Sequence, residues 1–231
     1  MHKKAGLNVS GEVFRFLKDL GNNNNREWFV KHKDRYTAAH EQMILFADDL
    51  LVRMNMHDRI ETPSGKKSLF RIYRDVRFSK EKTPYKTSWS GRFSRSTKYL
   101  RGGYYYHLEP GNSFAAGGFF NPNPEDLTRI RQDIDFNYAE WKKVLKSKAK
   151  FFSMLEGECL KKAPSGFTTD HPAIDLLRHK QFILKHRFTD KEVLGAGFSI
   201  LLSQTFKQMR PFFDYMSEVL TTDSNGAPLE E

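Results

Sequence analysis

The middle of the chain alternates between apolar and polar residues, while the residues on both sides of it repeat with a helical period. Alternation at every second residue is typical of a half-buried strand, and apolar residues at three- and four-residue steps are typical of an amphipathic helix. The alternating stretches are residues 69–79, 89–95, 104–109 and 114–120. We therefore expect an α+β fold with a central antiparallel sheet of about four or more strands, at roughly 68–120, packed by N-terminal and C-terminal helices.

Local signals mark the turns of the sheet and the ends of the helices. Pro110-Gly111-Asn112 separates two alternating stretches and predicts a hairpin. Gly117-Gly118 predicts a place where a strand flattens or another backbone approaches. Ser10 and Asn25 are good N-caps, the second of them for a long helix. We expect the last half of the chain to be mostly helical, with a kink or a new segment at Pro211.

Composition limits the classes of protein that this chain can belong to. Its 231 residues, 39% of them apolar, suffice for a buried core, so we expect a single domain over residues 10–220 with flexible tails at 1–9 and 221–231. No apolar run approaches the roughly 20 residues that span a bilayer, so no membrane contact is expected. The single cysteine, Cys159, leaves no internal disulfide and indicates a reducing cytoplasm.

No pattern in the chain predicts a cofactor. The P-loop, the dinucleotide fingerprint and the zincin motif all have no match. His107 and Glu109 have the spacing of two metal ligands on one strand, as do Asp170 and His171 side by side, but such pairs arise often by chance. We therefore expect neither a cofactor nor a metal ion.

The positive charge of the chain is concentrated in one stretch. Residues 59–101 hold 13 Lys and Arg against three acids, a net charge of +10. The formal net charge of the whole chain is also +10, so the remainder is neutral. A local excess of this kind raises the concentration of anions around it. Nucleic acid, a phosphorylated small molecule and an acidic protein surface are the partners that it would attract.

A strand over residues 69–79 would have two chemically different faces. The apolar face would carry Phe70, Ile72, Arg74, Val76 and Phe78. The polar face would carry Arg71, Tyr73, Asp75 and Arg77. Asp75 lies between the two arginines and could anchor Arg77, and a planar guanidinium group suits phosphate. Lys82 and Tyr85 follow in a loop, because Pro84 interrupts any strand ladder.

These residues predict a site for a phosphorylated or nucleic-acid-like anion on a basic sheet face, with or without catalysis. The candidates for anion binding are Arg71, Arg74, Arg77, Lys82 and Tyr73, the last of which could stack on a base. The candidates for catalysis are Asp75, His107 and Tyr85, and His107 could share a proton with Glu109 or Asp75.

Two other interpretations of the same residues remain open. The chain could be a non-enzymatic interaction module that docks an acidic protein or RNA. The arginine and aspartate motif could also be structural, with Arg74 and Asp75 in a buried network. Arg74 needs a carboxylate or carbonyl partner on an apolar face, because an unpaired buried charge is strongly destabilising. The sequence leaves open whether Arg74 faces a ligand or forms a structural ion pair.

The spacing of these residues resembles that of a known family. Arg71-x-x-Arg74-Asp75-x-Arg77-Phe78, followed by Lys82 and Tyr85, is similar to the signature of the domain of unknown function 2461 family of bacterial proteins. Two further stretches support the resemblance, Asn-Asn-Asn-Arg26-Glu27-Trp28-Phe29 and Tyr106-His107-Leu108-Glu109-Pro110-Gly111.

The resemblance covers about residues 10–220 and has one departure. Glu81 stands where the family usually has Asp or Asn, which puts a tight Asx turn in doubt. The resemblance implies an intact single domain and marks the same residues as the charge does. It implies no activity, because the function of the family is not established.

Overall fold

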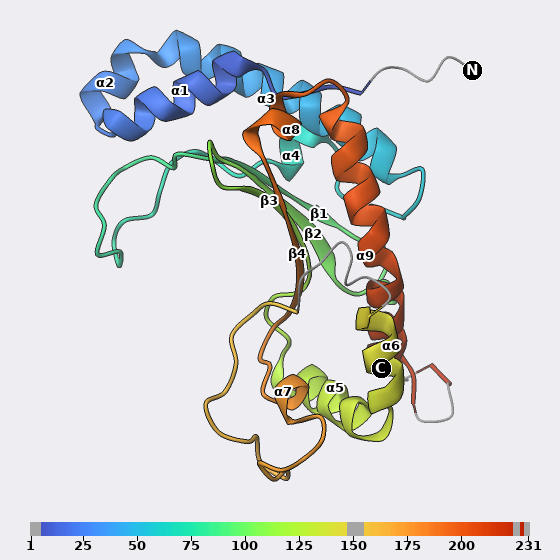
Figure 1. The fold of residues 1–231 in the computed structure, drawn as a ribbon. Coiled ribbons are helices and arrows are strands. Elements are labelled where there is room, and N and C mark those ends of the chain that lie inside the picture. The colour runs from blue at the N-terminus through green and yellow to red at the C-terminus, as the bar shows by residue number, and fades with distance from the viewer. Residues whose placement is uncertain (1–5, 147–154, 224–226, 229–231) are drawn as a thin grey trace. The chain divides into compact units, whose positions relative to one another are not determined.

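A computed structural model of the protein describes residues 6–146, 155–223 and 227–228. Four strands form one antiparallel sheet in the order β1-β2-β3-β4 (Figure 1). The strands are β1 (Trp89–Ser94), β2 (Gly103–Leu108), β3 (Ser113–Phe119) and β4 (Phe182–Phe188). The α+β class and the four-stranded antiparallel sheet are therefore confirmed.

The chain divides into two compact units, each assembled from three stretches. Unit 1 consists of Met1–Phe93, Tyr105–Ala115 and Arg187–Gln204. Unit 2 consists of Ser94–Tyr104, Ala116–His186 and Thr205–Glu231. The single domain over residues 10–220 stays a prediction. The flexible tails expected at 1–9 and 221–231 lie largely outside the described residues.

Unit 1 contains the N-terminal helices. They are α1 (Gly11–Asn22), α2 (Arg26–Lys31), α3 (Lys33–Met54) and α4 (Gly65–Ser68), joined by α8 (Asp190–Leu194) and the first residues of α9 (Phe198–Thr221). Ser10 and Asn25 cap α1 and α2 as predicted, because each side chain accepts a hydrogen bond from a backbone N–H of the first turn.

The single long helix predicted after Asn25 is wrong, because α2 and α3 are separated at His32. The backbone of His32 leaves the helical region, with φ −114° and ψ 28°. Its imidazole Nδ1 lies 2.8 Å from the carbonyl oxygen of Trp28, and its own backbone N–H bonds to the same oxygen. A side chain that competes for a backbone acceptor in this way favours a helix end over continuation.

The core of unit 1 lies between α3 and the inner face of the sheet. The ring of Phe46 on α3 lies 6.2 Å from that of Tyr106 on β2 and 5.8 Å from that of Phe198 on α9. The buried residues of the α3 stripe are Ala39, Met43, Phe46, Ala47, Leu50 and Met54. The period of three and four residues therefore identified the core face of this helix.

Unit 2 is built from α5 (Pro124–Phe136), α6 (Tyr138–Lys146), α7 (Ile174–Leu177) and the rest of α9. The fully buried Trp141 packs against Phe182 and Phe212. A new segment at Pro211 is wrong, because α9 continues through this residue. Pro211 is exposed while Phe212 and Phe213 are fully buried, so packing on one face holds the helix together where one backbone hydrogen bond is missing.

Strand β4 is a feature that the sequence did not predict. Its buried residues Phe182, Leu184 and Phe188 are interrupted by charged ones, and its pairing with β3 depends on a close approach of two backbones. Gly118 has φ +148°, and a Cβ atom there would collide with the carbonyl oxygen of Phe182. The close backbone approach predicted at Gly117-Gly118 is thus confirmed, although its partner was unknown.

The strand predicted over residues 69–79 is wrong. This segment, teal in Figure 1, leaves α4 as a long loop that turns back and enters β1. The loop pairs with its own return arm at a single bridge between Tyr73 and Tyr85, flanked by backbone bonds from Arg74 to Pro84 (2.9 Å) and from Lys86 to Ile72 (2.8 Å). Pro84 has no N–H to extend a ladder. We call residues 69–88 the basic loop.

Candidate functional site

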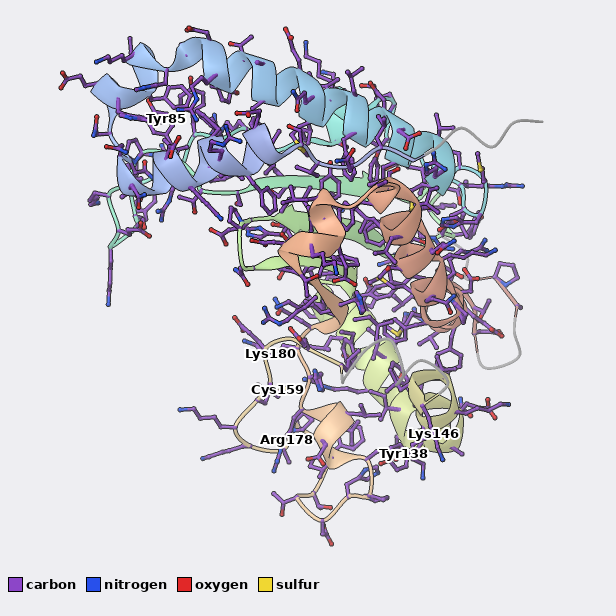
Figure 2. All side chains as sticks on the ribbon, turned by 45° about the horizontal axis from the view of Figure 1, so that its top comes forward. Tyr85, Tyr138, Lys146, Cys159, Arg178 and Lys180 are labelled. Atoms are coloured by element: carbon purple, nitrogen blue, oxygen red, sulfur yellow. The ribbon has the colours of Figure 1, made fainter. Side chains whose placement is uncertain are left out.

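The base of the basic loop is fixed to unit 1 by aromatic stacking. The ring of Tyr85 is buried and stacks on Phe29 of α2 at 4.0 Å, with 13° between the ring planes. Figure 2 shows Tyr85 among the N-terminal helices. The side chain of Asn24 donates to the carbonyl oxygen of Tyr85 (2.9 Å) and accepts from its N–H (3.1 Å). Tyr85, predicted as a catalytic candidate, therefore has a packing role, and burial raises the pKa of its phenol.

Both carboxylates of the basic loop are held by arginines of the same loop. Asp75 accepts from the Nε (3.0 Å) and Nη2 (2.7 Å) atoms of Arg77, the anchor that their spacing suggested. Glu81 lies 2.8 Å from Nη1 of Arg74 and accepts from the Thr83 hydroxyl at 2.5 Å. Hydrogen bonds from Arg77 lower the pKa of Asp75, and those from Thr83 and Arg74 lower the pKa of Glu81. Both acids are therefore ionised and paired at neutral pH.

Arg74 is neither on an apolar sheet face nor in a network with Asp75. Its side chain is 25% exposed, and its partner Glu81 is 63% exposed. Asp75 is paired separately with Arg77. The motif therefore forms two half-exposed ion pairs that shape the loop.

Four further cations of the loop have no carboxylate in hydrogen-bond contact among the interactions described for them, although the charge of Arg71 acts on Asp75. They are Arg71, Lys80, Lys82 and Lys86. Lys82 donates to the carbonyl oxygen of Val76 (3.0 Å), and Lys86 to that of Arg71 (2.9 Å). Six basic residues against two acids leave residues 69–88 with a net charge of +4. Of the net charge of +10 over residues 59–101, +4 therefore lies on this loop and the remaining +6 lies outside it.

Three aromatic side chains of the basic loop are exposed between these cations. Phe70 is 42% exposed, Tyr73 is 44% exposed and Phe78 is 95% exposed. The guanidinium of Arg77 lies 5.9 Å from the ring centroid of Phe78, and the ammonium of Lys86 lies 5.5 Å from that of Phe70. The alternation had placed Phe78 on an apolar face, yet it is the most exposed large hydrophobic residue described.

A second group of polar side chains lies on β2 in unit 1. The Tyr105 hydroxyl lies 3.2 Å from Nδ1 of His107, whose Nε2 lies 3.2 Å from a Glu109 oxygen. Thr87, at the end of the basic loop, donates to Glu109 at 2.7 Å. The three catalytic candidates therefore have different surroundings: Asp75 is paired within the loop, Tyr85 is packed at its base, and His107 lies on the strand.

Sequence reasoning named the arginines, Lys82 and Tyr73, but not the exposed rings of Phe70 and Phe78 or the half-buried Lys86. Phe70 and Phe78 were assigned to a core face, and Lys86 was not selected as a binding residue. The composition of the segment, in which rings and cations alternate, was the available signal. Burial decides which rings are free, and burial was not visible in the alternation.

Comparison with known proteins relates the chain to one family. A family model described as a conserved hypothetical protein, DUF2461, matches residues 12–215. The matched region contains both the basic loop and β2. The chain belongs to the DUF2461 family. No curated protein and no solved structure shows a significant match to it.

Among the described residues, no group of three or more His, Cys, Asp or Glu is arranged to hold a metal ion. None of the described helices combines the length and the apolar character that crossing a membrane requires. Because the family description names no activity, the function has to be argued from the basic loop and from the polar side chains at β2.

Proposed function

We propose that this DUF2461 protein binds single-stranded nucleic acid through the basic loop of unit 1. One observation carries the proposal: Phe70, Tyr73 and Phe78 are exposed along a loop that keeps a net charge of +4. Proteins that bind single strands combine cations, which follow the phosphates, with aromatic rings on which successive bases stack. The loop supplies both kinds of group in alternation.

The charge arrangement supports an anionic partner. The two acids of the loop are paired with Arg74 and Arg77, and of the other loop cations only Arg71 is described as acting on one of them, Asp75. Lys82 and Lys86 contact only neutral carbonyl oxygens and a ring in their described contacts, and Lys86 loses part of its hydration by burial. A phosphate placed next to such an ammonium adds a negative charge on the acceptor, so the bond is stronger than the one to an uncharged carbonyl oxygen that it replaces.

The anchoring of the loop supports binding by stacking. Tyr85 and Asn24 hold its base, while Phe78 near the tip is solvated on nearly all sides. A large exposed apolar side chain gains free energy when a base covers it. Stacking of one base on an aromatic ring contributes about 1–3 kcal/mol.

The distribution of cations and rings along the loop favours single-stranded nucleic acid over the other anionic partners. Arg71, Lys80 and Lys82 stand at separate positions along the sequence of the loop, a distribution that suits the repeated phosphates of a polymer better than a single phosphorylated small molecule. An acidic protein surface would use the cations but would leave the ring faces without stacking partners. A polymer with alternating phosphates and bases uses both.

The first test measures the stacking contribution by fluorescence anisotropy with labelled oligo(dT) and oligo(U) of about 20 nucleotides. We expect Phe78→Ala to raise Kd about 5- to 150-fold, the equivalent of one lost stack. The matched control is Phe136→Ala, since Phe136 is also highly exposed, at 83%, but lies on α5 and not in the basic loop. Equal effects of the two substitutions, or no binding by the wild type at low salt, would reject the proposal.

The second test measures the charge contribution from the dependence of log Kd on log salt. Lys80→Ala/Lys82→Ala should reduce the slope by about 1.4, because each phosphate contact to a single strand contributes about 0.7. The control pair Lys142→Ala/Lys143→Ala removes two exposed lysines of α6, one of them over the ring of Tyr138 (labelled in Figure 2), and should leave the slope unchanged. Stabilisation by a nucleoside diphosphate without oligonucleotide binding would favour a small-ligand site instead.

A further inference from the structure

Two side chains of β2, Tyr105 and His107, form a hydrogen-bonded chain with Glu109, which directly follows the strand, and nucleic-acid binding by the basic loop does not require this chain. Tyr105, His107 and Glu109 occur at every second position, so they lie on one face of the strand. The contacts run from the Tyr105 hydroxyl to Nδ1 of His107 and from its Nε2 to Glu109, each at 3.2 Å. All three side chains belong to unit 1.

Glu109 determines which nitrogen of His107 donates a hydrogen bond and which accepts one. It accepts from the Thr87 hydroxyl (2.7 Å) and from the Asn112 amide (3.0 Å). Burial opposes the charge, but the hydrogen bonds from Thr87, Asn112 and His107 lower the pKa of Glu109. An ionised carboxylate can only accept, so the neutral imidazole of His107 carries its proton on Nε2. The other nitrogen, Nδ1, is then an acceptor directed at the Tyr105 hydroxyl.

The imidazole of His107 is held in this orientation by packing. Its ring lies nearly flat on that of Phe114 of β3, with centroids 4.9 Å apart and 15° between the planes. The side chain of His107 is only 18% exposed. A base with a fixed ring and a fixed tautomer is ready to take a proton without reorganisation.

The phenol of Tyr105 needs such a base in order to react. Burial raises its pKa, a hydrogen bond with Ser90 lowers it, and the charge of Glu109 raises it, with a net increase. The hydroxyl is therefore protonated at neutral pH and becomes nucleophilic only as its proton leaves. The hydrogen bond with Ser90 lowers the pKa of the phenol, so it stabilises negative charge as it develops on the phenol oxygen.

We propose that Tyr105 is a catalytic nucleophile toward phosphate esters, with His107 as its general base and Glu109 as the positioning carboxylate. In the reaction the Tyr105 oxygen forms a bond to phosphorus while the bond from phosphorus to the leaving alcohol breaks. The phenol proton passes to Nδ1 of His107 and then to the leaving oxygen. A phosphotyrosyl bond and a free alcohol result, and water or another hydroxyl then releases the phosphate from Tyr105.

The surroundings of Tyr105 favour a phosphate ester over an uncharged substrate. Phe70 of the basic loop lies beside Tyr105, with 6.2 Å between ring centroids, and the ammonium of Lys86 lies 5.5 Å from the ring centroid of Phe70. Burial and the positive charge of Arg71 both lower the pKa of Lys86, because both destabilise its ammonium. An anion bound next to this ammonium would offset that cost and would itself be stabilised. The cation and the nucleophile therefore belong to the same part of unit 1.

The test uses an alkyl fluorophosphonate as phosphoryl electrophile and mass spectrometry of the tyrosine peptides. We expect faster labelling of the half-buried Tyr105 than of Tyr99, which is 51% exposed. His107→Ala and Glu109→Gln should slow labelling of Tyr105 by about 100-fold, the low end for a positioned general base, and leave that of Tyr99 unchanged. Added imidazole should restore labelling in His107→Ala, which loss of a merely structural contact would not allow.

A second measurement uses bis(4-nitrophenyl) phosphate and follows the release of nitrophenol. The wild type should release a burst equal to the protein concentration, and Tyr105→Phe, which keeps the ring but lacks the hydroxyl, should release none. Labelling of Tyr105 no faster than of Tyr99, or a burst that persists in Tyr105→Phe, would overturn the proposal. Oligonucleotide affinity and the rate of Tyr105 labelling are measured separately on the wild type, and the control Phe136→Ala should change neither, so failure of one proposal is distinguishable from failure of the other.

Discussion

The carboxylate of Glu81 lies 2.8 Å from the guanidinium of Arg74, and this ion pair joins the two arms of the basic loop. Thr83 lies between the two groups, accepting from Arg74 at 2.7 Å and donating to Glu81. The resemblance to the family had put a tight Asx turn at Glu81 in doubt. The longer side chain of glutamate instead reaches across the loop to an arginine.

Loss of this pair should loosen the loop without unfolding the protein. We expect Glu81→Ala to increase the rate of chymotrypsin cleavage after Phe78 severalfold, because the tip is then held by fewer contacts. The Tm should stay unchanged, since an exposed ion pair contributes little to global stability. Glu125→Ala, which removes the i,i+4 pair of Glu125 with Arg129, is the control and should leave cleavage in the loop unaffected.

The approach of β4 to β3 should depend on Gly118. Gly118→Ala places a methyl group against the carbonyl oxygen of Phe182, and we expect the free energy of unfolding to fall by about 3 kcal/mol or more in urea titrations. Gly111→Ala is the control, because it introduces a side chain at a position of positive φ without a steric collision. Gly111 has φ +77° and open space around it, so its substitution should cost only about 1–2 kcal/mol. Equal losses would show that close approach is not the cause.

Asp49 should make the stability of the protein depend on pH. It accepts from Arg53 (2.8 Å) and Ser199 (2.5 Å), and although burial opposes its charge, these bonds lower its pKa below the ordinary 3.8. A lowered folded-state pKa contributes stability that is present above pH 3.8 and is lost as the pH falls through the folded value.

We therefore expect Asp49→Asn to reduce stability by about 1–3 kcal/mol at pH 7 and by much less near pH 2. Urea titrations at several pH values measure the difference. The control is Asp19→Asn, since Asp19 pairs with Arg35 in a more exposed position, 41% exposed against 20% for Asp49. A constant difference between wild type and Asp49→Asn from pH 7 to about pH 2 would contradict the assignment.

Asp133 should be important for the packing of unit 2. It accepts from the indole N–H of Trp141 and from the Tyr215 hydroxyl, both at 2.7 Å. Asp133→Ala leaves these two donors without their acceptor, and we expect a loss of about 2–4 kcal/mol in the free energy of unfolding. Asp135→Ala removes a carboxylate of the same helix that pairs at the surface with His171, and should change stability by less than about 1 kcal/mol.

The features that were predicted correctly depend on residues close together in the chain. Ser10 and Asn25 cap helices because the donor and acceptor lie within three residues of each other. Asp75 binds Arg77 for the same reason. Glu81 and Arg74 meet only when the loop closes, so their pairing was not predictable from spacing.

The alternation over residues 69–79 shows why the rest was not predictable. A period of two identifies residues that would share a strand face, but a strand exists only if a neighbouring backbone supplies hydrogen bonds. In the basic loop the return arm contains Pro84 and pairs at one bridge, so Ile72 is buried while Phe78 points into solvent. Residues 182–188, with a weaker alternation, do form a strand, because Gly118 lets them approach β3.

The sequence by itself determined the helix caps, the core stripe of α3, the hairpin at residues 110–112 and the location of the positive charge, because each follows from neighbours along the chain. Only the tertiary structure decided that residues 69–88 form a loop, which of its rings are exposed, and that Thr87 meets Glu109 directly after β2. The physical reason is that burial and long-range hydrogen bonding depend on contacts between distant segments. A periodic pattern limits those contacts without selecting among them.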